Sequence, residues 1–269
     1  MFTLLKRIIQ HFFLLTQLVR VDLTGKYKTS VLGMLWIFLN PLILFFLYMF
    51  IFSIVLKVRF PEQQSVFFYG LNLFCGLIAW NAFAESIQRS SSVIMNHAHL
   101  IKRSLFPTEI LGISISLSTI IRLIIEMALF IVLLTAIGWQ ITPAFLWLPF
   151  LVILQLLFTT ALAWLVSAMT VLVRDLAHLV GPLLTVWFFM TPVVYPETMA
   201  KSLGGWQWLA FLIHINPMAK LISTYRGILL FGYFDFTPNV ILLTVFVLVF
   251  FLLSAAVFQK LQPEIIENL

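Results

Sequence analysis

The chain has 269 residues, of which 62% are hydrophobic and 10% are charged, and its formal net charge is +6. Soluble domains are about half apolar and about a quarter charged, so this composition excludes a chain whose main solvent is water and predicts an all-α polytopic membrane protein. Its single cysteine, Cys75, excludes an intrachain disulfide and a multi-cysteine metal site.

The first 32 residues predict a helix that lies on the membrane surface. Within Thr3–Thr24, polar residues recur at helical spacing opposite a stripe of leucine, isoleucine and valine, which gives one polar and one apolar face. Charges occur throughout this segment, and no compact apolar core precedes a small-residue cleavage site, so we expect no cleaved signal. A basic turn follows at residues 26–28. We expect residues 1–32 to form a cytoplasmic interface segment.

Residues 33–259 predict a six-span transmembrane domain. A helix needs about 20 apolar residues to cross about 30 Å of hydrocarbon. The runs that meet this are Gly33–Leu56, Val66–Ile87, Ile110–Ile137, Ala144–Val173, Leu176–Tyr195 and Val240–Phe258. Pro149 predicts a bend in the fourth span. The second span contains Asn72, Asn81 and Glu85, so we expect one of its faces to meet protein or water.

Two shorter apolar segments precede the last span. Trp206–Ile213 and Met218–Phe231 are each too short to cross comfortably, and the pair Asn216-Pro217 separates them. We therefore expect re-entrant half-helices in the region of about 197–234.

The distribution of Lys and Arg predicts the orientation. Six spans place both termini on one side, whereas a seventh crossing within the half-helix region, the less favoured count, would move the C-terminus across. The richer side carries Lys6, Arg7, Arg20, Lys26, Lys28, Arg89, Lys102, Arg103, Arg174 and Lys260, and the other carries Lys57, Arg59, Lys201, Lys220 and Arg226. Both termini, including a tail at 260–269, are therefore predicted to be cytoplasmic. The positive net charge therefore reflects the orientation of the chain in the membrane and the contact of its basic residues with lipid headgroups. We expect no nucleic-acid partner.

The cytoplasmic loop after the second span, residues 90–106, predicts a short amphipathic helix. Three serines are followed by an apolar stretch and a basic pair. Together with the N-terminal helix it would offer a soluble partner apolar and basic contacts, although anchoring to anionic lipid headgroups explains either helix alone equally well. His97 and His99 diverge on a helix and have no neighbouring acid or cysteine, so we expect no metal site.

Two charges lie inside the third span, where an ionised side chain costs about 3 kcal/mol or more. Arg122 and Glu126 are four residues apart and share one helix face. A neutralised pair that packs the bundle is the favoured interpretation, and a place beside a hydrated conduit is the alternative. The hydroxyl-bearing run from Ser114 to Thr119 indicates close helix packing.

The sequence contains no phosphate-binding loop of the form G-x-x-x-x-G-K-[ST]. Its one Gly-Lys pair, Gly25-Lys26, has Arg20 at the first glycine position and Tyr27 at the hydroxyl position. The H-E-x-x-H and G-x-S-x-G motifs are also absent from the sequence. We expect no catalytic residue, metal or cofactor in this chain, with ATP and Mg²⁺ bound by a partner subunit.

Several short motifs, taken in order and spacing, resemble the membrane subunit of bacterial type-two ABC exporters of O-antigen, capsule or teichoic-acid chains. The resemblance covers nearly the whole chain. Its motifs are Asp22-Leu23, Tyr27, Ser30, Leu32-Gly33, Trp36, Pro41, Lys102, Phe106-Pro107, Glu109, Arg174-Asp175, Thr191-Pro192-Val193-Val194-Tyr195, Asn216-Pro217 and Tyr225-Arg226.

This resemblance implies an inner-membrane permease in which two copies form a channel and two ATPase subunits dock on the surface helix and on a coupling helix at about 90–106. It also implies a lipid-linked polysaccharide as cargo and an outer gate at the half-helices. The expected ATPase-coupling residues are Arg20, Asp22, Tyr27, Asn96, His97, Lys102, Arg103, Phe106 and Pro107. The expected path or gate residues are Trp36, Arg122, Glu126, Trp187, Tyr195, Asn216, Pro217, Tyr225 and Arg226.

Three alternatives stay open at the level of sequence. An ABC exporter of drugs or lipids shares the six-span plan. A self-sufficient secondary transporter or channel would use Arg122, Glu126 and Glu85 to relay ions, although the six spans have no obvious inverted repeat. A membrane-bound enzyme would act on lipid-linked sugar as a single purified chain. Many aromatic residues near span ends are typical of interfacial belts, and some could instead stack on sugars.

Overall fold

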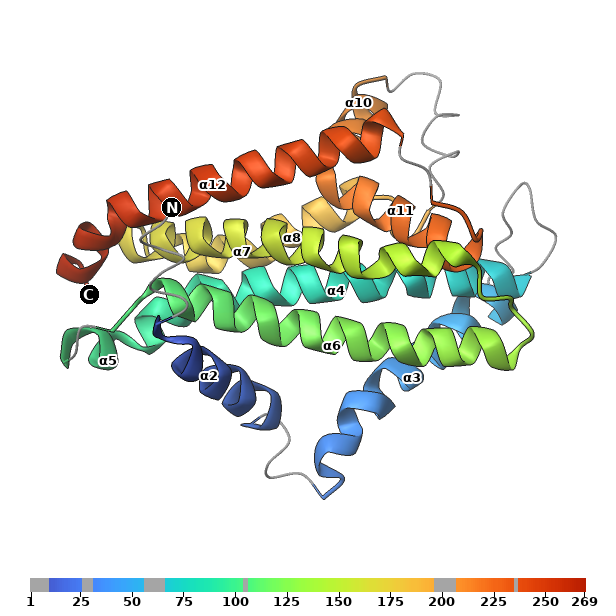
Figure 1. Cartoon of the computed structure of the whole chain (residues 1–269), viewed down its shortest axis with the longest axis horizontal. Helices are drawn as coiled ribbons and strands as arrows, with labels where there is room; N and C mark the ends of the chain where they lie inside the picture. The colour runs from blue at the N-terminus through green and yellow to red at the C-terminus, as the bar shows by residue number, and fades with distance from the viewer. Residues whose placement is uncertain (1–9, 26–30, 56–65, 104–105, 196–206, 235–236) are drawn as a thin grey trace.

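Four long helices run side by side along the computed structural model of the chain. The structure describes residues 10–25, 31–55, 66–103, 106–195, 207–234 and 237–269, and all regular structure within these ranges is helical. The long helices are α4 (Val66–Asn96), α6 (Glu109–Ala136), α7 (Leu148–Leu172) and α12 (Pro238–Glu267) (Figure 1). Helices suit a chain of this composition because each satisfies its own backbone groups in lipid.

The centre of the bundle is formed by α4, which contacts α6, α7, α8 and α11. Every residue of α4 from Phe68 to Trp80 is buried. Since lipid tails are as apolar as these side chains, close packing and polar contacts hold such helices together. Gly112 of α6 leaves room for the indole of Trp164 in α7, and the indole Nε1 donates to the carbonyl oxygen of Glu109 at 2.9 Å.

Two elements leave the bundle on the side of α6 (Figure 1). The helix α2 (Phe12–Gly25) packs on α6 through Leu15 and Val19 and leaves Phe13 exposed. A 3₁₀ turn η1 (Gly33–Leu35) leads into α3 (Trp36–Tyr48), which contains Pro41 and continues into a π-helical segment η2 (Met49–Val55). A helix is thus present from residue 12 onward, where the sequence predicts one, and the first part of the predicted helix lies outside the described residues. Its place on the membrane surface stays a prediction.

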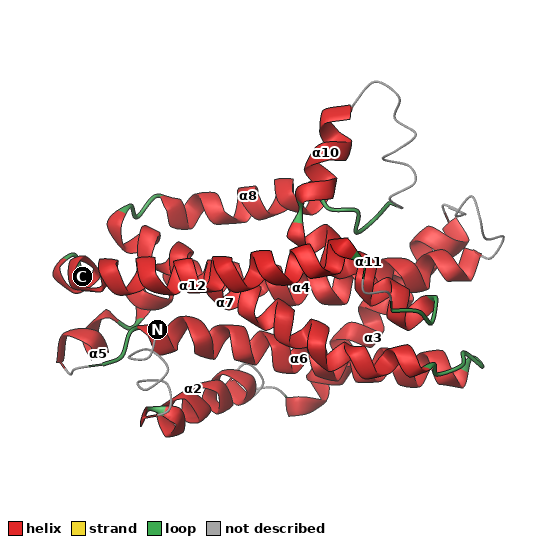
Figure 2. Ribbon diagram, turned by 45° about the horizontal axis from the view of Figure 1, so that its top comes forward, coloured by secondary structure: helices red, strands yellow, loops and turns green. Residues whose placement is uncertain are grey.

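Four shorter α-helices and one 3₁₀ segment complete the described structure. The helix α5 (Ala98–Arg103) follows α4, and η3 (Pro143–Trp147) leads into α7. The helix α8 (Leu176–Met190) runs beside α4, while α10 (Gln207–Ile215) projects from the bundle near the end of α8 (Figure 2). The helix α11 (Pro217–Leu230) packs against α4 and α7. We refer to the end of the bundle that carries α5 and the C-terminus as the α5 end.

The chain is a multi-pass membrane protein. Among the described residues, three helical stretches are long and apolar enough to cross a membrane, Glu109–Ala136, Pro143–Leu172 and Pro238–Glu267, and Trp36–Ile51 and Leu176–Met190 are shorter apolar helices. The third, fourth and sixth predicted spans therefore correspond to long apolar helices. The complete count of six and the re-entrant placement of α10 and α11 stay predictions.

Several predicted boundaries differ from the structure. The second span does not end at Ile87, because α4 continues to Asn96 and includes most of the region expected as a separate coupling helix. Serines 90–92 do not interrupt it, since the Ser91 hydroxyl donates to the carbonyl oxygen of Gln88 at 2.7 Å. The fifth helix ends at Met190, five residues early, and Pro149 lies in the first turn of α7. The C-terminal tail is a continuation of α12.

Candidate functional site

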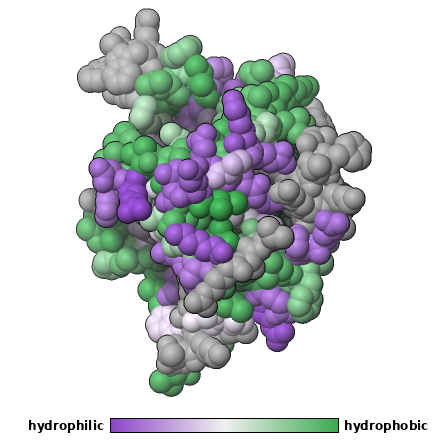
Figure 3. Space-filling view, turned by 90° about the vertical axis from the view of Figure 1, so that its left-hand side faces the viewer, coloured by the Kyte–Doolittle hydropathy of each residue, from purple (hydrophilic) through white to green (hydrophobic). Residues whose placement is uncertain are grey.

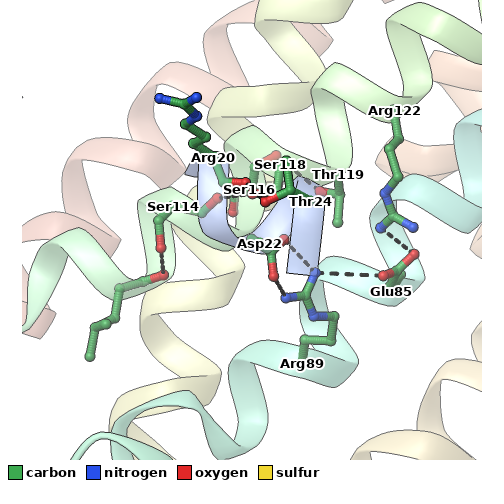
Figure 4. A network of polar contacts seen from close by, with 11 residues as sticks. Arg20, Asp22, Thr24, Glu85, Arg89, Ser114, Ser116, Ser118, Thr119 and Arg122 are labelled. Carbon is green, nitrogen blue, oxygen red and sulfur yellow. Dashed lines mark hydrogen bonds and ion pairs between the residues drawn. The ribbon is translucent and has the colours of Figure 1, made fainter. Parts of the chain in front are cut away.

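Near the α5 end, an ion pair joins α2 to α4. The Arg89 guanidinium of α4 donates from Nη1 to Oδ2 of Asp22 at 2.9 Å, and its Nη2 contacts the other carboxylate oxygen (Figure 4). Both side chains are about a quarter exposed, at 26% and 22%. Because a bidentate pair between Arg and carboxylate fixes distance and orientation together, it ties the surface helix to the bundle.

The same charges continue into α6. Arg89 Nη1 lies 3.6 Å from Oε1 of Glu85, one helical turn away, and Glu85 also forms an ion pair with Arg122 (Figure 4). Glu126 lies within electrostatic range of Arg122 and Glu85. The favoured sequence interpretation is a pair within one helix, Arg122 with Glu126. It does not include Glu85 of α4, whose ion pair with Arg122 joins two helices. We call these five residues the charge network.

The residues expected to contact an ATPase lie around this network at the α5 end. Arg20, Asn96 and Lys102 are exposed, and Phe106 is half-buried beside the buried Pro107. Figure 3 shows hydrophilic side chains gathered on this end of the molecule. Tyr27 lies outside the described residues, as does the side chain of Arg103.

A bend between α4 and α5 occurs at His97, whose imidazole Nδ1 lies 2.8 Å from the carbonyl oxygen of Val93. Nearby, a pocket of about 270 Å³ opens between α2, α4 and α6 and includes Asp22, Arg89 and Asn96 in its lining. The structure thus brings Asp22, Asn96 and His97 around one pocket. The described residues contain no group of three or more His, Cys, Asp and Glu residues that could hold a metal ion.

In the half of the bundle away from α5, Arg226 of α11 holds the turn that follows α8. Its Nη1 donates to the carbonyl oxygen of Pro192 at 2.7 Å, its Nη2 to that of Val193 at 2.7 Å, and its Nε to that of Asn72 in α4 at 3.2 Å. The side chain is 7% exposed. Gly76 makes room for it, since a Cβ atom there would lie 2.8 Å from Nη2.

Asn216 joins the same turn to the start of α11. Its Oδ1 accepts from the backbone nitrogen of Met218 at 3.0 Å and caps the helix, and it also accepts from Nε1 of Trp187 in α8 at 3.1 Å. Its Nδ2 donates to the hydroxyl of Thr191 at 2.8 Å. Pro217, which cannot donate a backbone hydrogen bond, occupies the first turn of α11. We call Arg226, Asn216 and the groups they bind the turn cluster.

Two tyrosine hydroxyls in this half donate to backbone carbonyl groups at and beyond the end of α8, and a third tyrosine is buried. The Tyr69 hydroxyl of α4 donates to the carbonyl oxygen of Val194 at 2.6 Å, and the Tyr195 hydroxyl donates to that of Phe189 at 2.9 Å. Tyr225 is fully buried in α11. Trp36 begins α3, which lies on the opposite side of the bundle from α10 and α11 (Figure 1).

The expected path or gate residues thus fall into three places. Trp187, Asn216 and Arg226 meet at the turn cluster, Arg122 and Glu126 belong to the charge network, and Trp36 is apart from both. Sequence reasoning missed the roles of Glu85 and Arg89 in pairing. Their spacing of four residues was the available signal, although nothing in the sequence indicated that Asp22, 67 residues earlier, completes the contact.

These observations define a helical multi-pass membrane protein with a polar α5 end and a hydrogen-bonded turn cluster in its other half. The family model described as ABC-2 type transporter matches residues 14–230, and the chain belongs to that family.

Similar curated proteins agree with this assignment. The O-antigen export system permease protein RfbA of Myxococcus xanthus is 32% identical over 228 residues, which cover 85% of this chain and 84% of that protein. A protein of the same name from Klebsiella pneumoniae is 29% identical over 260 residues, covering 96% of this chain and 95% of its own length. A second one from Klebsiella pneumoniae is 29% identical over 222 residues, with 82% of each chain covered.

Proposed function

We propose that the chain is the permease subunit of an ATP-driven exporter that moves lipid-linked polysaccharide across the bacterial inner membrane. The observation that carries the proposal is the likeness, over 96% of this chain, to a protein named for O-antigen export. Among the cargoes implied by the resemblance, O-antigen is therefore favoured over capsule or teichoic acid. ATP and Mg²⁺ are bound by a separate ATPase subunit, and this chain supplies the membrane path.

In this proposal, both termini and the α5 end face the cytoplasm, and two copies of the chain form the path between them. Two ATPase subunits dock on α2, α5 and the adjoining end of α4. Their closure on ATP displaces α2 and α5. The Asp22–Arg89 and Glu85–Arg122 ion pairs support this coupling, because they join α2 to two helices of the bundle. On the far side, α10, α11 and the turn cluster form the outer gate.

The docking part of the proposal is tested by substituting Lys102 and Phe106 together with alanine. We expect less ATPase subunit to copurify with the chain and less glycan to reach the cell surface. A matched control is Lys260→Ala, since Lys260 is equally exposed but lies on α12. Unchanged copurification and unchanged surface glycan in the double variant would refute the docking assignment.

The cargo part is tested by deleting the chain. Cells without it should lack surface O-antigen and should accumulate the lipid-linked glycan inside, and expression of the intact chain should reverse both effects. Normal surface glycan in the deletion strain, with sensitivity to a drug or a change in lipid distribution instead, would favour the alternative of a drug or lipid exporter.

A further inference from the structure

An open groove of about 670 Å³ lies between α4 and α8, apart from the turn cluster. Two aromatic side chains, Trp80 and Phe188, and three polar ones, Glu85, Gln88 and Thr185, contribute to its lining. The ring centroids of the two aromatic residues are 5.5 Å apart. The groove volume falls within the range of roughly 300–1,000 Å³ that is typical of ligand sites.

The polar side of this groove lies on the half of α4 nearer the α5 end, beside the middle of α6. Asn81 is the sixteenth of the 31 residues of α4, and Glu85 and Gln88 follow on the same helix face at intervals of four and three residues. Glu85 pairs with Arg122, the fourteenth of the 28 residues of α6. Glu85 thus lies within the predicted second span and beside the middle of α6, one helical turn from the Asp22–Arg89 pair.

Asn81 and Gln88 are exposed, and Glu85 is half-buried. Amide and carboxylate groups at this depth are unfavourable against hydrocarbon, and they face a protein interior or a water-filled cavity instead. By contrast, α12 exposes leucine, valine and isoleucine along its length, as a lipid-facing helix does. The groove face of α4 is therefore the face that meets water or a polar cargo.

The charge of the lining distinguishes between classes of cargo. Among the described residues that line the groove, Glu85 is the one with a charged side chain, and Arg89 and Arg122 pair with it. Phosphate and carboxylate groups are bound in proteins mainly by Arg and Lys, which this lining does not present. A sugar ring suits it better, because the apolar face of the ring can stack on an indole or phenyl ring while its hydroxyls bond to amide, carboxylate and hydroxyl groups.

We propose that the α4–α8 groove is the surface that contacts the cargo within the membrane, and that it takes an uncharged, hydroxyl-rich glycan in preference to a polyanionic one. This inference rests on the proposed export function and narrows its cargo. Trp80 and Phe188 supply the stacking surface, and Gln88, Glu85 and Thr185 supply the hydrogen-bonding groups.

The hydration of the groove is tested by cysteine labelling in the complete transporter. Cys75 is the chain's single cysteine and is buried, so Cys75→Ala gives a chain without other thiols, on which labelling is then measured. Gln88→Cys and Thr185→Cys in the groove lining, and Asn81→Cys at an exposed position one turn before Glu85, are together called the groove cysteines. They are labelled in membrane vesicles with the charged reagent 2-sulfonatoethyl methanethiosulfonate. The control is Leu252→Cys, at an exposed position in the middle of α12.

We expect the three groove cysteines to react at least about tenfold faster than the control, because the reactive thiolate forms in water and not in hydrocarbon. Labelling of all three positions as slow as that of Leu252→Cys would overturn the proposal. So would spontaneous disulfides between two copies at these positions together with slow labelling, since a second copy of the chain would then cover the groove.

The preference for uncharged cargo is tested by comparing Gln88→Glu with Gln88→Lys. Both variants should lower the surface glycan, because each removes the amide. The two reductions should agree within about twofold, because an uncharged polymer is neither attracted nor repelled by an added charge of either sign. A polyanionic cargo would instead give at least about tenfold less surface glycan with Gln88→Glu than with Gln88→Lys, and would overturn this part of the proposal.

The two proposals fail in different ways. If deletion of the chain leaves surface glycan unchanged, the proposed export function is wrong, whatever the groove cysteines do. If deletion abolishes surface glycan while the groove cysteines are unreactive, export stands and the location of the cargo surface is wrong. The labelling rates are measured without cargo and do not depend on its identity.

Discussion

Arg226 shows how one buried side chain can hold the turn that follows a helix. The buried carbonyl groups of Pro192 and Val193 lie beyond Met190, the last residue of α8, and an unsatisfied buried carbonyl costs about 1–3 kcal/mol. The guanidinium donates to the carbonyl oxygens of Pro192 and Val193 and, from its Nε, to that of Asn72 in α4. Three elements, α4, α8 and α11, are thereby fixed to one another at a single residue.

Arg226→Lys should destabilise this region although it keeps the charge. An ammonium cannot reproduce the planar fork of a guanidinium, so at least one carbonyl loses its partner at a cost of about 1–3 kcal/mol. The measurement is the Tm of the purified protein in detergent. Arg174→Lys is the control, because Arg174 is exposed and its substitution should change stability by less than about 0.5 kcal/mol. Equal Tm values for the two variants would contradict the role assigned to Arg226.

Asp22 tests the connection between the surface helix and the bundle. Asp22→Asn keeps the shape of the side chain but removes the charge that pairs with Arg89. We expect ATP hydrolysis by the assembled transporter to persist while surface glycan falls, because α2 is then less firmly joined to α4. Asp175→Asn, at an exposed position before α8, is the matched control and should leave both quantities near wild type. A parallel loss of hydrolysis and export would indicate a folding or docking defect instead.

At the scale of elements, α4 is the helix that connects the two polar regions. It carries Asn72, whose backbone belongs to the turn cluster, and Glu85 and Arg89 of the charge network. At 31 residues it is about 46 Å long, so it extends beyond a hydrocarbon core of about 30 Å. Because it continues to Asn96 without a break, the displacement proposed at α5 would act on the end of a rigid helix.

A break in α4 should therefore disconnect ATP hydrolysis from transport. Ser92→Pro removes a backbone donor and introduces a clash within the helix, at a cost of about 3 kcal/mol or more. We expect the variant to bind the ATPase subunit but to export little glycan, and Ser92→Ala, which keeps the helix, to export normally. Normal export by Ser92→Pro would show that continuity of α4 beyond Arg89 is not needed.

Much of the element order could be predicted from sequence, and the misses have physical reasons. Long apolar runs predicted α6, α7 and α12, and for each helix at least one predicted end lies within two residues of the observed end. The pair Asn216-Pro217 predicted the break between α10 and α11. The extension of α4 was missed because a serine run is typical of a loop, yet a serine hydroxyl can bond to a carbonyl within its own helix. The Arg226 contacts are to backbone oxygens of distant residues, which side-chain patterns do not indicate.

At the scale of the whole molecule, the faces of the bundle differ in what they present. α12 packs on α7 and exposes apolar side chains along its outer face, whereas the α5 end gathers hydrophilic ones (Figure 3). Such a division suits a protein whose sides meet lipid and whose end meets water.

A charge placed on the outer face of α12 should therefore prevent membrane assembly. Leu252 is exposed at the middle of this helix, and a lysine at a helix centre costs about 2.5–3.5 kcal/mol on insertion scales. Leu252→Lys should reduce the yield of monodisperse protein in membranes severalfold, and Leu252→Ala should not. Comparable yields for both variants would show that this face of α12 meets water or protein and not lipid.

The unbroken course of α12 from its first residue to Glu267 has one more consequence. About 22 Å separate the middle of this helix from its end, so a tilt of about 10° in the last span would displace the terminal residues sideways by about 4 Å. A spin label or fluorophore attached near Asn268 would therefore move sideways whenever the helix tilts about its middle. In the proposed two-copy exporter, its distance to the same label on the other copy would report how far the last span tilts as the partner subunits hydrolyse ATP.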